Sequence, residues 1–284
     1  MNLLSLVTTS TDRELWLRLG FFLIALLVLS ILEILFPRRP LSIKKSYRWF
    51  NNLGMVVINS LLLRVVFPGA TVGAALFAES NGWGLFHFLE IPFAISFILS
   101  LLILDFSIWA QHVVFHFIPP LWRLHRLHHA DLDFDVTTGL RFHPVEILFS
   151  MLIKVFMIML IGAPIVAVLC FEIVLNTLSM FNHSNIRIPS MIDKILRAFI
   201  VTPDMHRIHH SWHPEETNSN FGFNLSFWDK LFKVYRAEPR DGHSKMTIGL
   251  HEFRERSELS LAKMLAQPFR QSSIFKKKGV TRSI

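Results

Sequence analysis

The sequence predicts an all-α integral membrane protein with about four transmembrane or re-entrant helices and a cytoplasmic, histidine-rich helical cap. Three observations support this fold class. Of the 284 residues, 52% are hydrophobic, and the mean hydropathy of +0.43 exceeds that of an ordinary soluble domain. The apolar residues gather in runs long enough to cross a bilayer. Eleven of the 14 histidines lie between His112 and His213, and their tightest groups fall outside those runs.

The first three apolar runs predict three membrane helices. Residues 19–36 form the first run, in which Glu33 is the only charge. The second run covers residues 53–78 and is interrupted by Arg64, which we expect to reach an interface by snorkelling. The third run begins at Ile91 and stays uncharged to Leu104.

The fourth run, residues 147–181, is too long for one span and has a Gly-Ala-Pro break at 162–164. Glycine and proline end helices, so the run predicts a hairpin of short spans or a re-entrant pair, each half about 25 Å long. Its only charges, Lys154 and Glu172, fall one in each half, and Lys154 is also expected to snorkel. In either arrangement the chain returns to its starting side before His183.

The loop charges predict the orientation. The loop at 37–48 holds five Lys or Arg, whereas the loop at 79–90 holds none. The positive-inside rule therefore places the 37–48 loop in the cytoplasm, and the third run then delivers His112 to the cytoplasmic face. The region 241–284 is basic and is predicted to be a cytoplasmic tail on the same side. We therefore expect a multi-pass protein whose histidine-rich site faces the cytoplasm.

The overall composition narrows the possible partners and cofactors. The net charge is +8, but the basic residues flank apolar runs and no nucleic-acid-binding motif is present, so anionic headgroups are the expected contact. The single cysteine, Cys170, lies in an apolar run. One cysteine excludes an internal disulfide, a cysteine-based zinc site and a cysteine-ligated iron–sulfur cluster.

Ten histidines have the spacing or position of metal ligands. A His-x-x-x-His pair places two imidazoles one turn apart on one helix face, and a His-x-x-His-His triplet shares largely one face. At about 5% histidine, one such triplet is expected roughly 0.03 times by chance in a chain of this length, and this chain has two. The candidates are His112, His116, His125, His128, His129, His143, His183, His206, His209 and His210.

The number of histidines favours two metal ions. Imidazole suits zinc, copper, iron and nickel, and one ion takes about six ligands at most, so ten histidines are too many for one site. A two-metal site has its ions roughly 4 Å apart, which requires ligands from several helix ends to converge. A zinc hydrolase and a metal transporter remain alternatives. Zinc sites usually have three or four ligands, and a transporter places its ionisable ligands near the bilayer midplane, so both fit the pattern less well.

The same residues resemble the fatty acid hydroxylase/sterol desaturase superfamily, which carries an HxxxH…HxxHH…HxxHH signature. The resemblance covers roughly residues 104–235 and includes the motifs at 137–144, 181–185 and 228–232. Two departures occur, because members often have Arg where Val113 stands and Gly-Thr where Lys233 and Val234 follow the last motif. These departures leave the histidines intact.

The resemblance implies a membrane-embedded di-iron oxygenase that uses O2 as co-substrate, with the ten histidines as ligands. Members hydroxylate or desaturate sterols, fatty acyl chains, sphingolipids, carotenoids or alkylglycerols. We therefore expect O2-dependent hydroxylation, or alternatively desaturation, of a C–H bond in a membrane lipid. The expected organisation is an N-terminal transmembrane region over 1–90, a catalytic domain over 91–240 and the basic tail over 241–284.

Four carboxylates near the histidine motifs are candidates for accepting the second N–H of a ligand imidazole: Asp105, Glu146, Asp204 and Asp229. Asp105 precedes His112 by seven residues and shares its helix face, although a helix-end charge at the membrane surface is an equal alternative.

O2 activation needs two electrons, and the sequence shows no haem-binding domain or dinucleotide fingerprint. A separate reductase, ferredoxin or cytochrome is therefore expected. Arg123, Arg126 and Arg207 are predicted either to form a basic face for an acidic electron carrier or to pair with nearby carboxylates.

Overall fold

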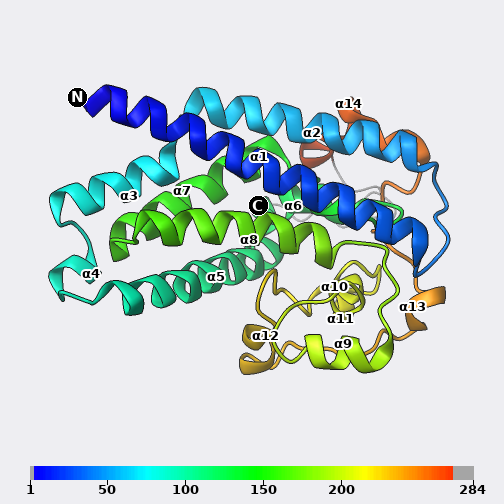
Figure 1. Ribbon diagram of the computed structural model, residues 1–284. Coiled ribbons are helices and arrows are strands. Elements are labelled where there is room, and N and C mark those ends of the chain that lie inside the picture. Colours follow the sequence, from blue (N-terminus) through cyan, green and yellow to red (C-terminus); the bar gives the residue numbers. More distant parts are fainter. Residues whose placement is uncertain (1–2, 271–284) are drawn as a thin grey trace, which may run out of the picture.

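The computed structural model describes residues 3–270, which form a bundle of long helices with a cap of short helices and loops at one end (Figure 1). The bundle consists of α1 (Leu3–Leu35), α2 (Lys45–Val66), α3 (Ala70–Asn81), α4 (Leu85–Phe88), α5 (Phe93–Phe117), α7 (Pro144–Ile161) and α8 (Ile165–Asn182). The cap consists of α6 (Pro119–His129), α9 (Ser190–Leu196), α10 (Pro203–His209), α11 (Pro214–Thr217), α12 (Phe227–Leu231), α13 (Gly242–Lys245) and α14 (Leu261–Ala266), with 3-10 turns at Thr138–Leu140, Arg256–Leu259 and Gln267–Phe269.

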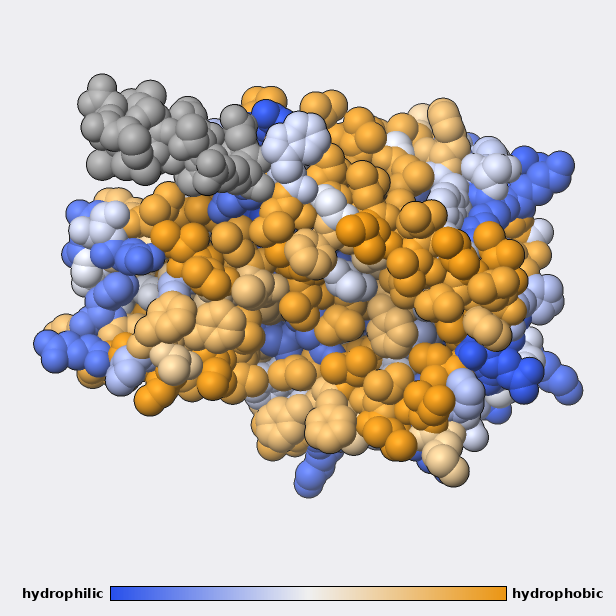
Figure 2. All heavy atoms as spheres, viewed as in Figure 1, coloured by the Kyte–Doolittle hydropathy of each residue, from blue (hydrophilic) through white to orange (hydrophobic). Residues whose placement is uncertain are grey.

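Five helical segments are long and apolar enough to cross a membrane, namely residues 14–35, 45–88, 93–117, 144–161 and 165–182. Large apolar side chains point outward from them, such as Ile24 and Phe156, each 62% exposed. Figure 2 shows a broad apolar surface between hydrophilic residues at the two ends of the molecule. A surface of this kind is stable only when lipid covers it, so the expectation of an all-α integral membrane protein is confirmed.

The predicted break in the fourth run separates two helices of 18 residues each, α7 and α8. Gly162 ends α7 with a φ of +69°, a left-handed conformation that glycine adopts without strain. Its backbone also lies against Gly84, where an added Cβ would approach Gly162 N to 2.3 Å. The two glycines therefore allow the turn to pack closely at the end of the bundle far from the cap.

The helix α5 connects the membrane region to the cap. Its 25 residues give about 37 Å of helix, which is longer than the roughly 30 Å hydrocarbon core. Pro119 and Pro120 then start α6, where their missing N–H groups cost no helix hydrogen bond. His112 and His116 consequently stand where the helix leaves the membrane region.

Buried charges attach the cap to the ends of α1 and α2. Glu33 Oε1 accepts hydrogen bonds from the backbone N–H groups of Val136 (2.7 Å) and Asn185 (2.8 Å), and its other oxygen pairs with Lys45. The only charge in the first apolar run therefore organises two cap loops.

Residues 241–270, the described part of the predicted basic tail, are folded against the rest of the chain. Met246, Ile248 and Met264 are buried, and the N–H of Leu261 donates to Asn51 Oδ1 at 2.7 Å. These apolar residues lie in a basic segment, so its overall charge concealed them. The remainder of the predicted tail lies outside the described residues.

Candidate metal centre

Nine of the ten predicted histidines converge in two buried groups at the junction of bundle and cap. In each group, one ring nitrogen of every member lies within 4.8 Å of the others. The groups adjoin each other, because the His129 and His210 rings stack with centroids 4.5 Å apart. The first group contains His112, His116, His125, His129 and His209, and the second contains His128, His183, His206 and His210.

The two triplets divide their histidines in opposite ways. On α6, the first and last residues of the triplet join the five-histidine group, and the middle residue, His128, joins the other. At α10, the first and last residues join the four-histidine group, and the middle residue, His209, joins the five-histidine group. Each triplet therefore contributes to both groups, which fixes the two groups beside each other.

His116 Nδ1 lies 3.3 Å from Asn218 Oδ1, and four further rings have their Nδ1 closer to an oxygen atom. The acceptors are Phe221 O for His112, Glu146 Oε1 for His125, Ser179 O for His183 and Ser219 O for His209, at 2.6 to 2.7 Å. Donation from Nδ1 leaves Nε2 as an unprotonated nitrogen with a free lone pair. These bonds set both the ring orientation and the tautomer that a metal requires.

The Nε2 atoms then face one another at distances that suit a shared metal ion. His112 Nε2 lies 3.0 Å from Nε2 of both His125 and His209, and His183 Nε2 lies 3.0 Å from His128 Nε2 and 3.2 Å from His210 Nε2. Two metal–nitrogen bonds of about 2.1 Å that meet at a right angle place their nitrogens about 3.0 Å apart. Lone pairs that converge without a proton between them need a cation, so both groups fit a transition metal.

Burial keeps these imidazoles neutral. It lowers the pKa of His125 and of His183 to about 3. Burial, followed by the proximity of other histidines, holds the pKa of His206 and His210 well below the ordinary value. The candidate ligands outside the membrane segments therefore have no proton to lose before a metal binds at neutral pH.

His143 does not join either group, in contrast to the sequence-based expectation. It is the residue before α7, where its Nδ1 accepts the Val145 N–H at 3.2 Å and its Nε2 lies 3.3 Å from Leu265 O. Both ring nitrogens of His143 therefore have partners outside the two histidine groups. The motif Arg-Phe-His-Pro at 141–144 thus positions α7, whose next acidic residue is Glu146.

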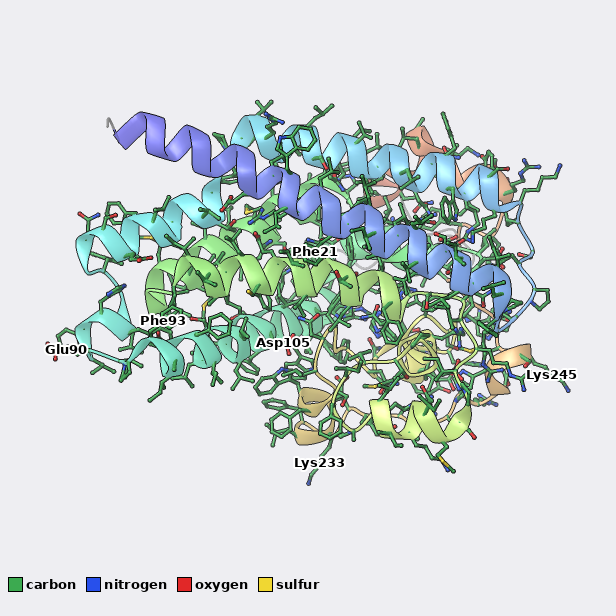
Figure 3. The ribbon with its side chains drawn as sticks, viewed as in Figure 1. Phe21, Glu90, Phe93, Asp105, Lys233 and Lys245 are labelled. Carbon is green, nitrogen blue, oxygen red and sulfur yellow. The ribbon has the colours of Figure 1, made fainter. Side chains whose placement is uncertain are left out.

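Of the four candidate carboxylates, only Glu146 contacts a histidine of either group within residues 3–270. Asp105 instead accepts the Trp228 Nε1–H at 2.8 Å, on the side of α5 that meets the cap (Figure 3). Asp204 pairs with Arg38 at 3.0 Å and with Arg207. Asp105 and His112 share a helix face, but this does not bring them into contact, because seven residues of α5 separate the two side chains by about 10 Å.

Asp229 acts on the metal centre through the backbone. Its oxygens accept the N–H groups of Phe221 and Gly222, each at 2.9 Å, and Trp109 Nε1–H at 2.8 Å. The Phe221 carbonyl in turn accepts from His112. Asp229 thus fixes the peptide that orients a ligand, and burial raises its pKa to about 6.

Two of the three arginines beside the triplets are buried, so the three do not form the predicted basic face, and Arg123 alone of them is exposed. Arg207 is fully buried, pairs with Asp204 and donates to Ser184 O at 3.2 Å. Arg126 is 4% exposed and donates to the Gln267 carbonyl, and Arg123 Nε donates to Pro268 O at 2.7 Å. The alternative prediction, pairing with nearby carboxylates, describes Arg207, which pairs with Asp204, and Arg126, whose Nη1 lies 3.3 Å from Glu252 Oε1. The physical reason is that the C-terminal segment covers α6.

Several residues that support the site were missed by the sequence analysis. The acceptors at Ser179, Ser219 and Phe221 are backbone carbonyls, which every residue has, so no sequence signal marks them. Gly139, in contrast, lies within the motif at 137–144 that the sequence analysis identified. A Cβ at this position would come within 2.5 Å of Ser179 O and 3.0 Å of His183 Nδ1, so only glycine leaves room for this ligand.

A cavity of about 450 Å³ opens from the five-histidine group into the membrane region. His112, His125 and Glu146 line its inner end. Its walls are mostly apolar and come from α1, α2, α5, α7 and α8, with Phe22, Leu63, Phe115, Leu140, Phe142, Leu175 and Phe223 among them. The cavity therefore provides an apolar compartment of lipid-tail character directly beside the candidate metal ligands.

A membrane-spanning helical bundle with two adjoining buried histidine groups, one of them at the end of an apolar cavity, has the features of a membrane metalloenzyme. The family model described as fatty acid hydroxylase matches residues 97–234, which include both histidine triplets. The chain is similar to that family over about half of its length, and it is an oxidoreductase of the lipid hydroxylase/monooxygenase class.

Characterised relatives share this class. The chain is 28% identical to the ornithine lipid hydroxylase OlsE of Rhizobium tropici over 87% of this chain and 74% of the relative. It is 27% identical to the alkylglycerol monooxygenase of Xenopus tropicalis over 77% of this chain and 46% of the relative. It is 26% identical to the cholesterol 25-hydroxylase of Rattus norvegicus over 52% of this chain and 48% of the relative. The matched region thus covers under half the length of the latter two relatives. No solved structure matches it.

Changing Glu146 to Gln is expected to reduce metal affinity or activity by about 10- to 100-fold, because the carboxylate that raises the basicity of His125 is lost. Asp105→Asn, at a carboxylate that touches no ligand, is expected to leave the metal content at the wild-type value. Metal analysis of both purified variants checks this difference. Equal loss of metal in the two variants would contradict the assignment of Glu146 as the orienting group.

Proposed function

We propose that this protein is a di-iron monooxygenase that hydroxylates a C–H bond of a membrane lipid. The observation that carries the proposal is the position of the five-histidine group at the inner end of an apolar cavity between membrane helices. The balanced reaction takes a C–H bond, O2, two electrons and two protons to an alcohol and one water. We propose hydroxylation over desaturation, because the relatives described above are named hydroxylases or monooxygenases.

The protein's own residues hold, orient and shield the reacting groups. We propose nine histidines as ligands, five for one iron ion and four for the other. Bound iron would supply the activation of O2. Buried walls around His112 and His125 exclude water, and the cavity aligns the lipid with them. Glu146 Oε2 is buried without a hydrogen-bond partner in the described chain, so it is placed to hold a proton near the inner end.

We further propose that the site faces the cytoplasm and receives its electrons from a separate reductase, ferredoxin or cytochrome. The basic 37–48 loop lies at the cap end, since Arg38 contacts Asp204 and Arg39 donates to Met246 O. The positive-inside rule assigns that end to the cytoplasm. Figure 3 shows Lys245 at this end and Glu90 at the opposite one.

The test is mass spectrometry of lipids from a host with the wild-type chain, with a His209→Ala variant and without the chain. A lipid that gains 16 Da only with the wild-type chain, and 18 Da under 18O2, supports hydroxylation. A loss of 2 Da would replace hydroxylation by desaturation. Stoichiometric zinc in protein isolated from its native host, with no lipid changed, would favour a zinc hydrolase.

A further inference from the structure

Three charged side chains meet inside the membrane region at the outer part of the same cavity. Glu172 on α8 is 5% exposed, and its Oε1 lies 3.0 Å from Lys154 Nζ of α7. Its Oε2 pairs with Arg18 of α1 and accepts from Thr71 Oγ1 at 3.2 Å. Lys154 therefore does not snorkel to an interface, contrary to the expectation from the sequence. Arg18, Lys154 and Glu172, which we call the intramembrane charge cluster, line the cavity together with His112 and His125.

The cluster lies far from either end of the helices that carry it. Lys154 and Glu172 fall near the middle of the candidate membrane helices α7 and α8. Lys154 follows Glu146 by eight residues on α7, which corresponds to about 12 Å of helix. Charged residues at such a depth are costly, and they mark substrate or ion pathways more often than structural sites.

The cluster also leaves polar atoms without partners. Glu172 takes both cations, and Arg18 Nε is buried with no hydrogen-bond partner in the described part of the chain. Glu14, one turn before Arg18, is a second carboxylate near Arg18 and Glu172, and its Oε1 is also buried without a partner there. An ion pair whose only role was to hold α1 against α8 would need a single cation and would not need to line a cavity. Spare N–H donors at a cavity wall instead fit a ligand with oxygen acceptors.

We propose that the intramembrane charge cluster binds an oxygen-bearing polar group of the lipid substrate and so determines which carbon reaches the metal centre. The group is a carboxylate or a carbonyl oxygen located about 12 Å from the C–H bond that is oxidised. The inference rests on the proposed function for the identity of the reaction, but the binding itself does not require turnover. The apolar walls between the two ends hold the intervening chain.

The test compares three probes of equal chain length on the purified full chain in detergent: palmitate, methyl palmitate and hexadecane. Dissociation constants are measured by native mass spectrometry without O2 or reductant. The wild-type protein is expected to bind at least one of the oxygen-bearing probes about tenfold or more tightly than hexadecane, the size of one charge-assisted hydrogen bond. Preference for palmitate alone would identify a carboxylate site, and equal preference for the ester would identify a carbonyl site.

The decisive variant is Lys154→Met, because it removes one donor from the cavity wall and leaves Glu172 paired with Arg18. It is expected to lose the tenfold discrimination, and Lys154→Arg is expected to retain it. Arg64→Met, at an exposed cation of α2, is the matched control and should bind as the wild type does. Discrimination that is absent in the wild type, or unchanged in both Lys154→Met and Arg18→Met, would overturn the inference.

Regioselectivity provides a second readout that a purely structural cluster would not move. With a lipid that the wild-type protein oxidises at one carbon, Lys154→Met is expected to give products at several neighbouring carbons, with its metal content unchanged. A single product position in that variant would contradict the proposed role. If no lipid is oxidised by any variant while the binding discrimination persists, the proposed function fails and the binding site stands.

Discussion

Replacing His210 by alanine is expected to remove the metal ion from the four-histidine group and to lower lipid oxidation to less than about 1% of wild type. The change leaves three histidines in that group, His128, His183 and His206. Loss of a residue that only supports a ligand typically costs about 10- to 100-fold, and loss of a ligand should cost more. Metal analysis should give one ion per chain in place of two, because the five-histidine group is unchanged.

His143→Ala is the matched control for this prediction. His143 belongs to the same sequence motifs but caps α7 at a distance from both groups. Its loss is expected to lower stability by about 1 kcal/mol, the usual cost of a lost cap, and to leave the metal content at two ions. A loss of metal in His143→Ala equal to that in His210→Ala would restore the ten-ligand set and contradict the division into five and four.

Replacing Arg48 by methionine is expected to destabilise the fold by about 3 to 5 kcal/mol, the cost of leaving a buried charge without its partner. Arg48 is fully buried, donates to both oxygens of Asp131 at 2.7 and 2.8 Å, and pairs with Asp135. These aspartates lie in the loop that directly follows α6. Their repulsion in the variant would displace this loop and with it His128 and His129.

The same ion pair predicts how the effect depends on pH. Burial by itself would raise the pKa of Asp131, but the Arg48 guanidinium outweighs it and holds that pKa well below its usual range. An acid with a lowered folded-state pKa stabilises the fold fully above its unfolded pKa of about 3.9, and this contribution is lost as the pH falls further. The gap in melting temperature between wild type and Arg48→Met should therefore be large at pH 7 and narrow on acidification below pH 4.

Thermal unfolding in detergent measures both effects, with Arg64→Met as the control. Arg64 is on the same helix but is exposed, so its replacement should shift the melting temperature little. A melting temperature of Arg48→Met equal to that of the control would show that the buried pair contributes nothing to the fold.

Local sequence periodicity determined most of the fold class and the chemistry of the site. Apolar runs of membrane length and a Gly-Ala-Pro break predicted the spans and the α7–α8 hairpin, because helix length and helix ends depend on neighbouring residues. The spacing of the two triplets predicted a histidine metal centre, since residues three and four apart share a helix face wherever the helix lies. The proposed oxidation of lipid follows from the same motifs.

Only the tertiary structure decided how these residues are used. The alternating division of the triplets, the capping role of His143, the burial of Arg207 and the pairing of Lys154 with Glu172 all depend on contacts between distant segments. The carboxylates show the same limit, because Glu146 reaches a ligand from another helix whereas Asp105, on the ligand's own helix, does not. The sequence by itself determined that histidines would gather and bind metal, because ligand chemistry and helix periodicity are local. Which ones meet, and what charge or cavity lies beside them, was decided by packing, because packing alone sets the distance between residues far apart in the chain.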